Sequence, residues 1–241
     1  MKIIYASWEK RNLGVNCEEL NAGYNDSLNE FIVFIRELKA EYQVVKIPAG
    51  RTDMLLTAQS FGFQVIELNI QLSRIMNKYS LPSIYKRFEA VINVVEAEKK
   101  DIKFVLDEIK KGDLFVTDKV ARDPYFSTRK SGNRYYEWSK DVLDQGAHLY
   151  LAQYKGMNVG FGLNRSDDGH FYDAFLGGVF PQYANKGLGF LTLHTNLMSI
   201  ASQGGNKVKT GVSSNNSSIL RLHLLFGFDI QEMKYILIKH A

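Results

Sequence analysis

The sequence predicts a mixed α/β fold, in which a central sheet of parallel and antiparallel strands is flanked by helices. Apolar residues recur at spacings of three, four and seven in residues 102–109, which is the periodicity of an amphipathic helix. Residues 148–180 alternate between apolar and polar side chains in three short runs, which indicates strands. Residues 60–74 also resemble residues 225–239 without a gap, so one unit of the fold occurs twice.

The repeated unit reads as strand, helix, glycine stop and strand. "SFGFQVIELNIQLSR" (60–74) aligns with "LFGFDIQEMKYILIK" (225–239), and "YQVVKIPAG" or "KVKTGVSS" precedes it as the first strand. Gly62 and Gly227 stand where a helix end favours a left-handed residue. We therefore predict a partial N-terminal domain over 1–76, a linker with Pro82 over 77–87, and a complete domain over 88–241.

The elements of the second domain follow in order. Residues 88–112 read as a strand and an amphipathic helix with Ile102, Val105, Leu106 and Ile109 on its apolar face. A helical loop comes next, and three antiparallel strands follow over 148–180 with turns at "YKGMN" and "RSDDG". A glycine turn, a helix, a strand, a helix and a closing hairpin complete the domain.

Composition excludes several classes of protein. The 241 residues contain one cysteine, Cys17, which can form neither an internal disulfide nor a zinc site, and we expect no metal. A net charge of +4 with scattered lysines and arginines does not favour nucleic acid as a partner. No stretch approaches the roughly 18 apolar residues of a membrane span. The opening "MKIIYASWEKR" lacks the apolar core of a secretory signal, so we expect a cytoplasmic location.

The segment "FPQYANKGLGFL" (180–191) joins an apolar strand to a helix through two glycines. The first N–H groups of a helix have no partner within it, and such groups suit a phosphate or diphosphate. A Walker loop is excluded because Lys186 precedes Gly187, and a dinucleotide fingerprint is excluded because Thr192 replaces its third glycine. A helix-start turn with glycines for packing alone is the other interpretation.

Two longer segments that include this loop narrow its interpretation. The run "GGVFPQYANKGLGFL", followed by "VSSNNSSILRLHLLFGF", resembles the GCN5-related N-acetyltransferase (GNAT) superfamily, and "VVEAEKKDIKFVLDEI" looks like the first strand and helix of that family. The resemblance covers 88–239. It implies the GNAT fold, preceded by a truncated GNAT-like half domain, and acetyl-CoA as the co-substrate.

The resemblance also implies which residues bind the coenzyme. They are Gly178, Val179, Ala184, Asn185, Lys186, Gly187, Leu188, Gly189, Phe190 and Asn216. The Val179 N–H would lie near the thioester carbonyl, with a β-bulge at Gly177 and Gly178. The family usually has Gln or Arg where this chain has Ala184, so the backbone donors of the loop and Lys186 must serve instead.

Two residues are candidates for proton transfer. His223 follows Asn216 by seven residues, on the same face of a helix, and we expect it to protonate the departing thiolate where the family more often has Tyr. Asp173 resembles the catalytic base of one branch of the family. A histidine packed against an apolar helix and a solvated carboxylate are the structural alternatives.

A narrower resemblance concerns the acceptor. "WEKRNLGVN", "ARDPYF" and "NRYYEW" are similar to segments of the dTDP-fucosamine acetyltransferases, although the catalytic tyrosine of that type is absent. This implies a nucleotide-linked amino deoxysugar (a dTDP-4-amino-4,6-dideoxyhexose) as acceptor and a role in cell-surface polysaccharide biosynthesis. Guanidinium groups bind phosphates and aromatic rings stack on sugars or bases. The candidate residues are Arg122, Tyr125, Arg134, Tyr135 and Trp138.

Two other functions stay open at this stage. The chain could be a catalytically silent module that binds acetyl-CoA and regulates a partner, which the unusual Ala184 and His223 motivate. It could also acetylate a protein or peptide amine. An edge strand that pairs with its own copy would make a homodimer, which the sequence leaves open.

Overall fold

The first part of the chain builds three short strands, a long strand and three helices. The computed structural model describes residues 1–76, 78–166 and 168–241. In chain order, the elements up to residue 76 are β1 (Lys2–Tyr5), α1 (Ser7–Leu13), β2 (Cys17–Asn21), α2 (Leu28–Glu37), β3 (Tyr42–Pro48), α3 (Thr52–Ser60) and β4 (Gln64–Ile75).

The second part contains the elements predicted for it, with one exception. They are the 3₁₀ helix η1 (Ser83–Val91), β5 (Ile92–Glu96), α4 (Lys99–Lys110), α5 (Lys119–Arg122), α6 (Thr128–Asp144), β6 (His148–Tyr154), β7 (Met157–Ser166), β8 (Phe171–Val179), the 3₁₀ turn η2 (Pro181–Tyr183), α7 (Leu191–Ser202), β9 (Lys207–Ser213), α8 (Ser217–Leu225) and β10 (Asp229–His240). The predicted closing hairpin is wrong, because β10 is one long strand that pairs on both sides.

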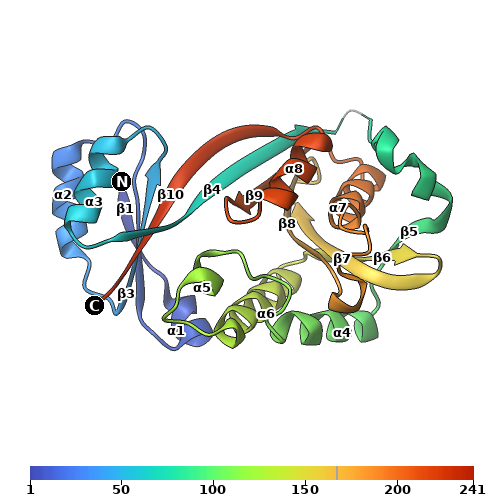
Figure 1. Cartoon of the computed structure of the whole chain (residues 1–241), viewed down its shortest axis with the longest axis horizontal. Helices are drawn as coiled ribbons and strands as arrows, with labels where there is room; N and C mark the ends of the chain where they lie inside the picture. The colour runs from blue at the N-terminus through green and yellow to red at the C-terminus, as the bar shows by residue number, and fades with distance from the viewer. Residues whose placement is uncertain (77, 167) are drawn as a thin grey trace.

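All ten strands belong to one mixed sheet. Their order is β1-β2-β3-β10-β4-β9-β8-β7-β6-β5, so β1 and β5 are the edges. Figure 1 shows the sheet running along the whole length of the molecule, with both termini at the end that carries α2 and α3. This confirms the predicted mixed sheet flanked by helices. The division into domains at 77–87 stays a prediction, since the sheet runs across it.

The sequence repeat is visible in the register of the sheet. β4 and β10 pair antiparallel, with Ser73 opposite Asp229 and Gln64 opposite Ile238. In the repeat, residue 64 aligns with 229 and residue 73 with 238, so these two pairs are equivalent to each other. The two copies are therefore related by a local two-fold axis between β4 and β10.

The copies also exchange their last strands. β10 pairs with β3 of the first copy, with Lys234 opposite Pro48, and β4 pairs with β9 of the second copy, with Asn69 opposite Ser213. These registers are again equivalent under the repeat. Each copy thus completes its part of the sheet with a strand from the other.

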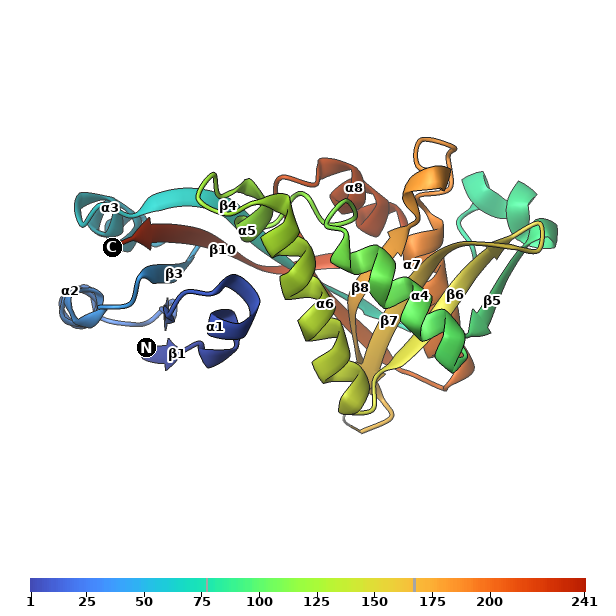
Figure 2. The same ribbon diagram turned by 90° about the horizontal axis from the view of Figure 1, so that it is seen from below.

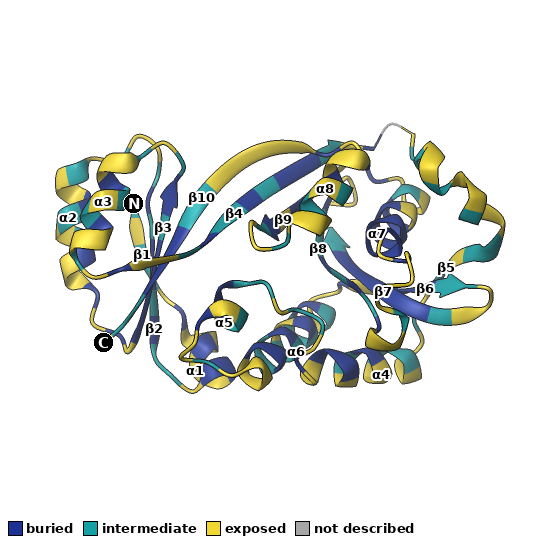
Figure 3. Ribbon diagram, viewed as in Figure 1, coloured by how far each residue is buried: buried dark blue, intermediate teal, exposed yellow. Residues whose placement is uncertain are grey.

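Helices cover both faces of the sheet in the second part. Figure 2 shows α4 and α6 on one face, and α7 and α8 lie on the opposite side. Val105 and Ile109 of α4 pack with Leu151 and Phe161 of the sheet, as the helical periodicity predicts. Helix α7 is buried along most of its length (Figure 3), against strand residues such as Leu72 and Val208.

The segment predicted as a linker is packed against the start of α7. The ring of Tyr85 stacks on Phe190 with centroids 4.3 Å apart, and Phe88 lies 5.2 Å from the same ring. The Tyr79 hydroxyl lies 2.7 Å from His194 Nδ1. These contacts pack the segment against the end of the loop and the first turn of α7. Residue 77 lies outside the described part of the chain.

Within the described ranges, every helix is too short or too polar to cross a membrane. The cytoplasmic location expected from the sequence stays a prediction.

Candidate active site

The parallel strands β8 and β9 separate after three residues. Their pairing runs from Phe171 opposite Lys207 to Asp173 opposite Lys209, and in the described residues it does not continue along β8. At the branch point the Thr210 Oγ1 donates a 2.7 Å hydrogen bond to the Ala174 carbonyl oxygen. Beyond it, the main chain of β8 as far as Val179 is left without a strand on the β9 side. This gap is the central feature of the candidate site.

The Val179 N–H points into this gap. The Phe180 N–H donates to the Val159 carbonyl oxygen at 2.9 Å, and successive residues of an antiparallel strand direct their N–H groups to opposite sides. Val179, which lies opposite Gly160, therefore turns its N–H away from β7. The bulge predicted at Gly177 and Gly178 lies earlier, at residues 174–175, where the register with β7 shifts by one residue. Thr210 and Asn164 lie beside that shift, whereas the two glycines pair regularly.

The loop 184–190 presents a row of unbonded backbone donors. Ala184 N–H bonds to the Pro181 carbonyl oxygen, and α7 begins with the Leu191 N–H bonded to Leu188. Across the described ranges, none of the N–H groups of residues 185–190 donates to another backbone group. Most of this loop is exposed. It therefore offers the donors that the glycine motif predicts.

Two apolar side chains hold the loop in place. Leu188 and Phe190 are buried in the core around α7, while the residues on either side of each are exposed or belong to the helix. The Lys186 Nζ lies 5.3 Å from the centre of the Tyr183 ring, so its charge stays beside the loop. The Ala184 side chain is exposed and adds no polar group, as expected.

Gly187 and Gly189 differ in backbone conformation, and only the first requires glycine for its φ angle. Gly187 has a φ of +74°, and Asn185 also adopts a positive φ of 60°. Gly189 has an ordinary φ, and a Cβ on either glycine would meet no atom within 4 Å. Side chains there would fill open space outside the protein, so their absence leaves the backbone N–H groups accessible.

Helix α8 brings two predicted residues to the same groove. Asn216 is the N-cap of α8, and its side chain accepts a 3.2 Å hydrogen bond from the Ile219 N–H. His223 lies two turns further along, with its ring 4.9 Å from Phe228. Both residues line a cleft of ≈ 920 Å³ that also reaches Gly177 in the gap and Thr192 at the start of α7.

The protonation of His223 differs from the expectation. Burial lowers its pKa from 6.5 to about 4, although a hydrogen bond with the Ile219 carbonyl oxygen works in the opposite direction. The Nδ1 atom lies 2.8 Å from that oxygen and must donate to it. The ring is therefore neutral at pH 7, with Nε2 as an acceptor, which argues against the role as a general acid.

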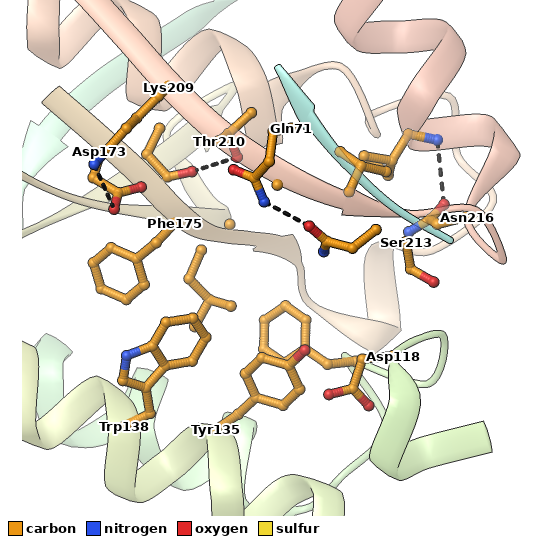
Figure 4. Close-up of a pocket in the computed structure, with 18 of the residues that line it drawn as sticks. Gln71, Asp118, Tyr135, Trp138, Asp173, Phe175, Lys209, Thr210, Ser213 and Asn216 are labelled. Carbon is orange, nitrogen blue, oxygen red and sulfur yellow. Dashed lines mark hydrogen bonds and ion pairs between the residues drawn. The ribbon is translucent and has the colours of Figure 1, made fainter. Parts of the chain in front are cut away.

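The cleft continues from the gap across the sheet face beneath α5 and α6. Figure 4 shows Tyr135 and Trp138 of α6 on one wall, opposite Gln71, Thr210 and Ser213 of the sheet, while Phe175 reaches toward Trp138 from β8. The ring of Trp138 lies 5.2 Å from that of Phe175, and the ring of Tyr135 lies 4.5 Å from that of Phe115. One wall is thus aromatic and the floor is polar.

The predicted acceptor residues divide into two groups. Tyr135, Trp138 and Arg134 line the cleft, whereas Arg122 and Tyr125 do not. Arg122 is exposed at the end of α5, and the ring of Tyr125 stacks on His240 at 4.1 Å. The structure therefore brings together only three of the five.

Arg134 is engaged in ion pairs within the protein. Its Nε lies 2.9 Å from Glu9, its Nη1 lies 3.2 Å from Asp118, and the Glu9 side chain is fully buried. Burial alone would lower the pKa of Arg134, but these two carboxylates raise it. The guanidinium already has two anionic partners, so the predicted role in binding phosphate does not fit this geometry.

Asp173 lies at the branch point of β8 and β9. Its carboxylate is 4.0 Å from the Lys209 Nζ, a quarter of its side chain is exposed, and it faces the cleft (Figure 4). The position is compatible with the predicted catalytic base, which stays a prediction.

The sequence analysis did not identify several polar residues of the cleft floor. Glu67, Asn69 and Gln71 lie on β4 and line the cleft. They alternate with Leu68, Ile70 and Leu72, a pattern that normally indicates a solvent-exposed face. The alternation was visible in the sequence, but nothing in it indicated that α6 covers this face.

No group of three or more His, Cys, Asp or Glu side chains that could hold a metal ion occurs in the part of the chain that the structure describes.

Comparisons with known proteins identify the fold. No family model matches the sequence, and no curated protein matches it. Among solved structures, a GCN5-related N-acetyltransferase from Sphaerobacter thermophilus superposes with a TM-score of 0.57 at 14% identity, over 83% of this chain and 59% of that one. The present chain thus spans less than two thirds of that protein.

Two further structures are similar over more of their length. A functionally unknown conserved protein from Staphylococcus epidermidis gives a TM-score of 0.60 at 12% identity, over 94% of this chain and 85% of that one. A tandem GNAT protein from the clavulanic acid biosynthesis pathway gives 0.53 at 10% identity, over 88% and 68%. At such identities the likeness concerns the fold, and together with the separated strands and the exposed loop it shows that this chain has the fold of the GCN5-related N-acetyltransferases.

Proposed function

We propose that the protein is an acyl-CoA-dependent N-acyltransferase that moves an acetyl group from acetyl-CoA to the amine of a small acceptor. The observation that carries this proposal is the row of accessible N–H groups at 185–190, placed beside the gap between β8 and β9. Charge-assisted hydrogen bonds from such donors suit the diphosphate of the coenzyme.

Different parts of the site would serve different parts of acetyl-CoA, which supplies the activated acyl group. The loop donors would bind the diphosphate, with the Lys186 charge nearby. The open side of β8 would accept the pantetheine amides, and the Val179 N–H would stabilise negative charge on the carbonyl oxygen during transfer. Asn216 and His223 would form the opposite side of the groove.

Proton transfer needs a group that takes a proton from the acceptor amine. Asp173 is the candidate, directly or through water, because it is a partly exposed carboxylate at the branch point. The neutral His223 would accept a hydrogen bond at Nε2 and so position the amine or a water molecule. The departing thiolate would take its proton from solvent or from the amine.

The acceptor named by the sequence resemblance is a dTDP-linked amino deoxysugar. The aromatic wall of Phe115, Tyr135 and Trp138 supports it, since such faces stack on sugars and bases. The ion pairs of Arg134 speak against a diphosphate at that place. The sugar nucleotide therefore remains one acceptor to be tested, along with simpler amines.

A thiol-release assay tests the proposal. Purified protein is mixed with acetyl-CoA and a panel of dTDP- and UDP-linked amino sugars, amino acids, diamines and a lysine peptide, and free coenzyme A is followed. We expect release with at least one small amine. Tight binding of acetyl-CoA without release would indicate the silent regulatory module, and release with the peptide alone would indicate a protein acetyltransferase.

A further inference from the structure

One carboxylate oxygen that belongs to a cleft residue has no hydrogen-bond partner. Glu67 of β4 is 7% exposed, lines the cleft, and its Oε2 atom makes no hydrogen bond. Buried polar atoms in folded proteins are nearly always paired, and an unpaired carboxylate oxygen is costly. Because the residue lines the cleft, a carboxylate oxygen left unpaired there points to a ligand that pairs with it.

The neighbouring charges are already matched to one another. Glu19 takes both lysines in its surroundings, with the Lys119 Nζ at 2.7 Å and the Lys46 Nζ at 2.6 Å. Arg134 is held between Glu9 and Asp118, as described above. None of these cations is within ion-pair distance of Glu67.

The ion pairs around Glu67 leave it without a cation. Glu9 and Asp118 pair with Arg134, and Glu19 pairs with Lys46 and Lys119. Lys234, which also lines the cleft, pairs with Glu232 at 3.2 Å.

The hydroxyl groups nearby satisfy Glu67 only in part. Ser213 has a single hydroxyl hydrogen, for which Glu67 competes with the Thr117 carbonyl oxygen at 2.9 Å. The Tyr135 hydroxyl is engaged with Asp118, which also raises the pKa of that tyrosine beyond the effect of its burial. Both hydroxyls are therefore occupied as long as they keep these bonds.

Burial raises the pKa of Glu67 and outweighs a hydrogen bond with Ser213, which lowers it, and the nearby Asp118 raises it further. A cation placed against the carboxylate would favour its ionised form and recover part of the desolvation cost. The aromatic side chains of Phe115 and Tyr135 stand across the cleft, where they can pack against methylene groups.

We propose that Glu67 binds a second, positively charged group of the acceptor, so that the preferred acceptor is an aliphatic diamine or polyamine. One amine lies at the gap between β8 and β9, and the other ammonium pairs with Glu67 at the far end of the cleft. The inference rests on the proposed acyl transfer for the first amine, but the binding of the ammonium can be measured without it.

The experiment compares matched amines and matched variants. Unbranched diaminoalkanes of increasing length are each paired with the monoamine of the same length, and kcat/KM for coenzyme A release is measured. The wild type should prefer the best diamine by at least about tenfold, which is the strength of one charge-assisted hydrogen bond. Glu67→Gln, which keeps the shape and removes the charge, should abolish this preference while the rate with the monoamine changes little.

Glu232→Gln is the matched control. Glu232 is the counterpart of Glu67 in the repeat, but it is half exposed and lies 3.2 Å from the Lys234 Nζ. This variant should keep the preference for the diamine. An equal loss in both variants, or no preference in the wild type, would overturn the inference and leave the acyltransferase proposal intact.

A binding measurement separates the two proposals. If no amine releases coenzyme A, the acyltransferase proposal fails, and the rise in Tm caused by the diamine then decides the inference. A rise in the wild type and in Glu232→Gln that is lost in Glu67→Gln supports it, whereas equal shifts in all three refute it.

Discussion

The two halves of the molecule contain the same parallel pair of strands in two states. In the first half, β2 and β3 pair over all five residues of β2, from Cys17 to Asn21. In the second half, β8 is longer but pairs with β9 over only three residues. The closed pair leaves no main chain free between its strands, and the open pair does. The fold alone therefore does not make the site, since the separation of one strand pair is also required.

The equivalent helices α3 and α8 also differ, because only α8 presents polar side chains to the cleft. Asn216 and His223 align in the repeat with Arg51, which precedes α3, and with Ala58 in the last turn of α3. Asn216 caps its helix and faces the cleft, whereas Arg51 forms no cap and instead bonds to Asp53 and to the loop at Tyr24. Ala58 is fully buried against its own core. The first copy is packed for stability, and the second keeps polar groups at a groove.

Substituting Gly189 by valine should have the largest effect. The φ of Gly189 is ordinary and its surroundings are open, so the fold should be unchanged and Tm should stay the same. The side chain would cover the loop donors, and the loss of two charge-assisted hydrogen bonds, about 2 kcal/mol each, raises the Kd for acetyl-CoA about 10³-fold. Calorimetric titration measures this.

The control lies in the first half. Gly23 is in the connection between β2 and α2, which is the counterpart of the glycine loop, and Gly23→Val should leave the Kd unchanged. Unaltered binding in Gly189→Val would show that the coenzyme lies elsewhere and would remove the functional distinction between the halves.

The buried histidines should make the second half sensitive to acid. Burial lowers the pKa of His194 and of His223 from 6.5 to about 4. The unfolded chain takes up protons below pH 6.5 while the folded protein does not, so stability falls as the pH drops from 6.5 to 4, by about 3 kcal/mol for each histidine. Urea unfolding at pH 7 and at pH 4.5 measures the loss.

The variant His223→Gln should show a smaller loss between these two pH values than the wild type. Ala58, at the aligned position in the first half, cannot titrate, so all of this difference belongs to the second copy. A loss identical to that of the wild type would mean that His223 is protonated as readily in the folded protein as in the unfolded one.

The pair Glu67 and Glu232 should respond differently to the loss of charge. The pKa of Glu67 is raised in the folded protein, so its ionisation opposes folding once the pH exceeds the ordinary glutamate value. Glu67→Gln should therefore be more stable than the wild type at pH 7, by about 1 kcal/mol, and equal to it at pH 3, where both forms are neutral.

Glu232→Gln serves as the reference, because an exposed ion pair contributes little. Thermal unfolding at both pH values gives the comparison. A destabilised Glu67→Gln at pH 7 would show that the carboxylate has a partner in the folded protein.

The smallest effect, and an equal one in both halves, is expected at the glycines that end α3 and α8. Gly62 and Gly227 have φ values of +87° and +76°, and a Cβ on each would lie near a side chain of the other copy, Lys239 or Arg74, at 3.8 and 4.0 Å. Each substitution by alanine should cost about 1 kcal/mol of stability through the left-handed backbone. Costs that differ by more than this amount would show that the local two-fold symmetry does not extend to the energetics.

The elements and the exposed loop 184–190 were predictable from the sequence, and the contacts at the other end of the cleft were not. Gly187, Gly189 and Asn216 act through local backbone geometry, which a motif reports directly. The partners of Arg134 are Glu9, 125 residues away, and Asp118. No short pattern carries such a contact, so a guanidinium engaged in the protein was interpreted as one available to phosphate.

Glu67 illustrates a second reason. Alternating polar residues in a strand indicate which side chains share a face, but not whether water or a helix covers that face. The exchange of strands between the copies could not be predicted for the same reason. The residue patterns of β4 and β10 are equally compatible with pairing in their own half and with pairing in the other half.

The position of β10 has a consequence for biosynthesis. β10 separates β3 from β4, and both neighbours of β4 come from residues beyond 206. The first half therefore leaves the ribosome with open edges on β3 and β4 that only β9 and β10 can cover, and its sheet closes only after Asp229–His240 have emerged. Folding of the first half must wait for β10, so removal of β10 should unfold the half of the protein that was synthesised before it.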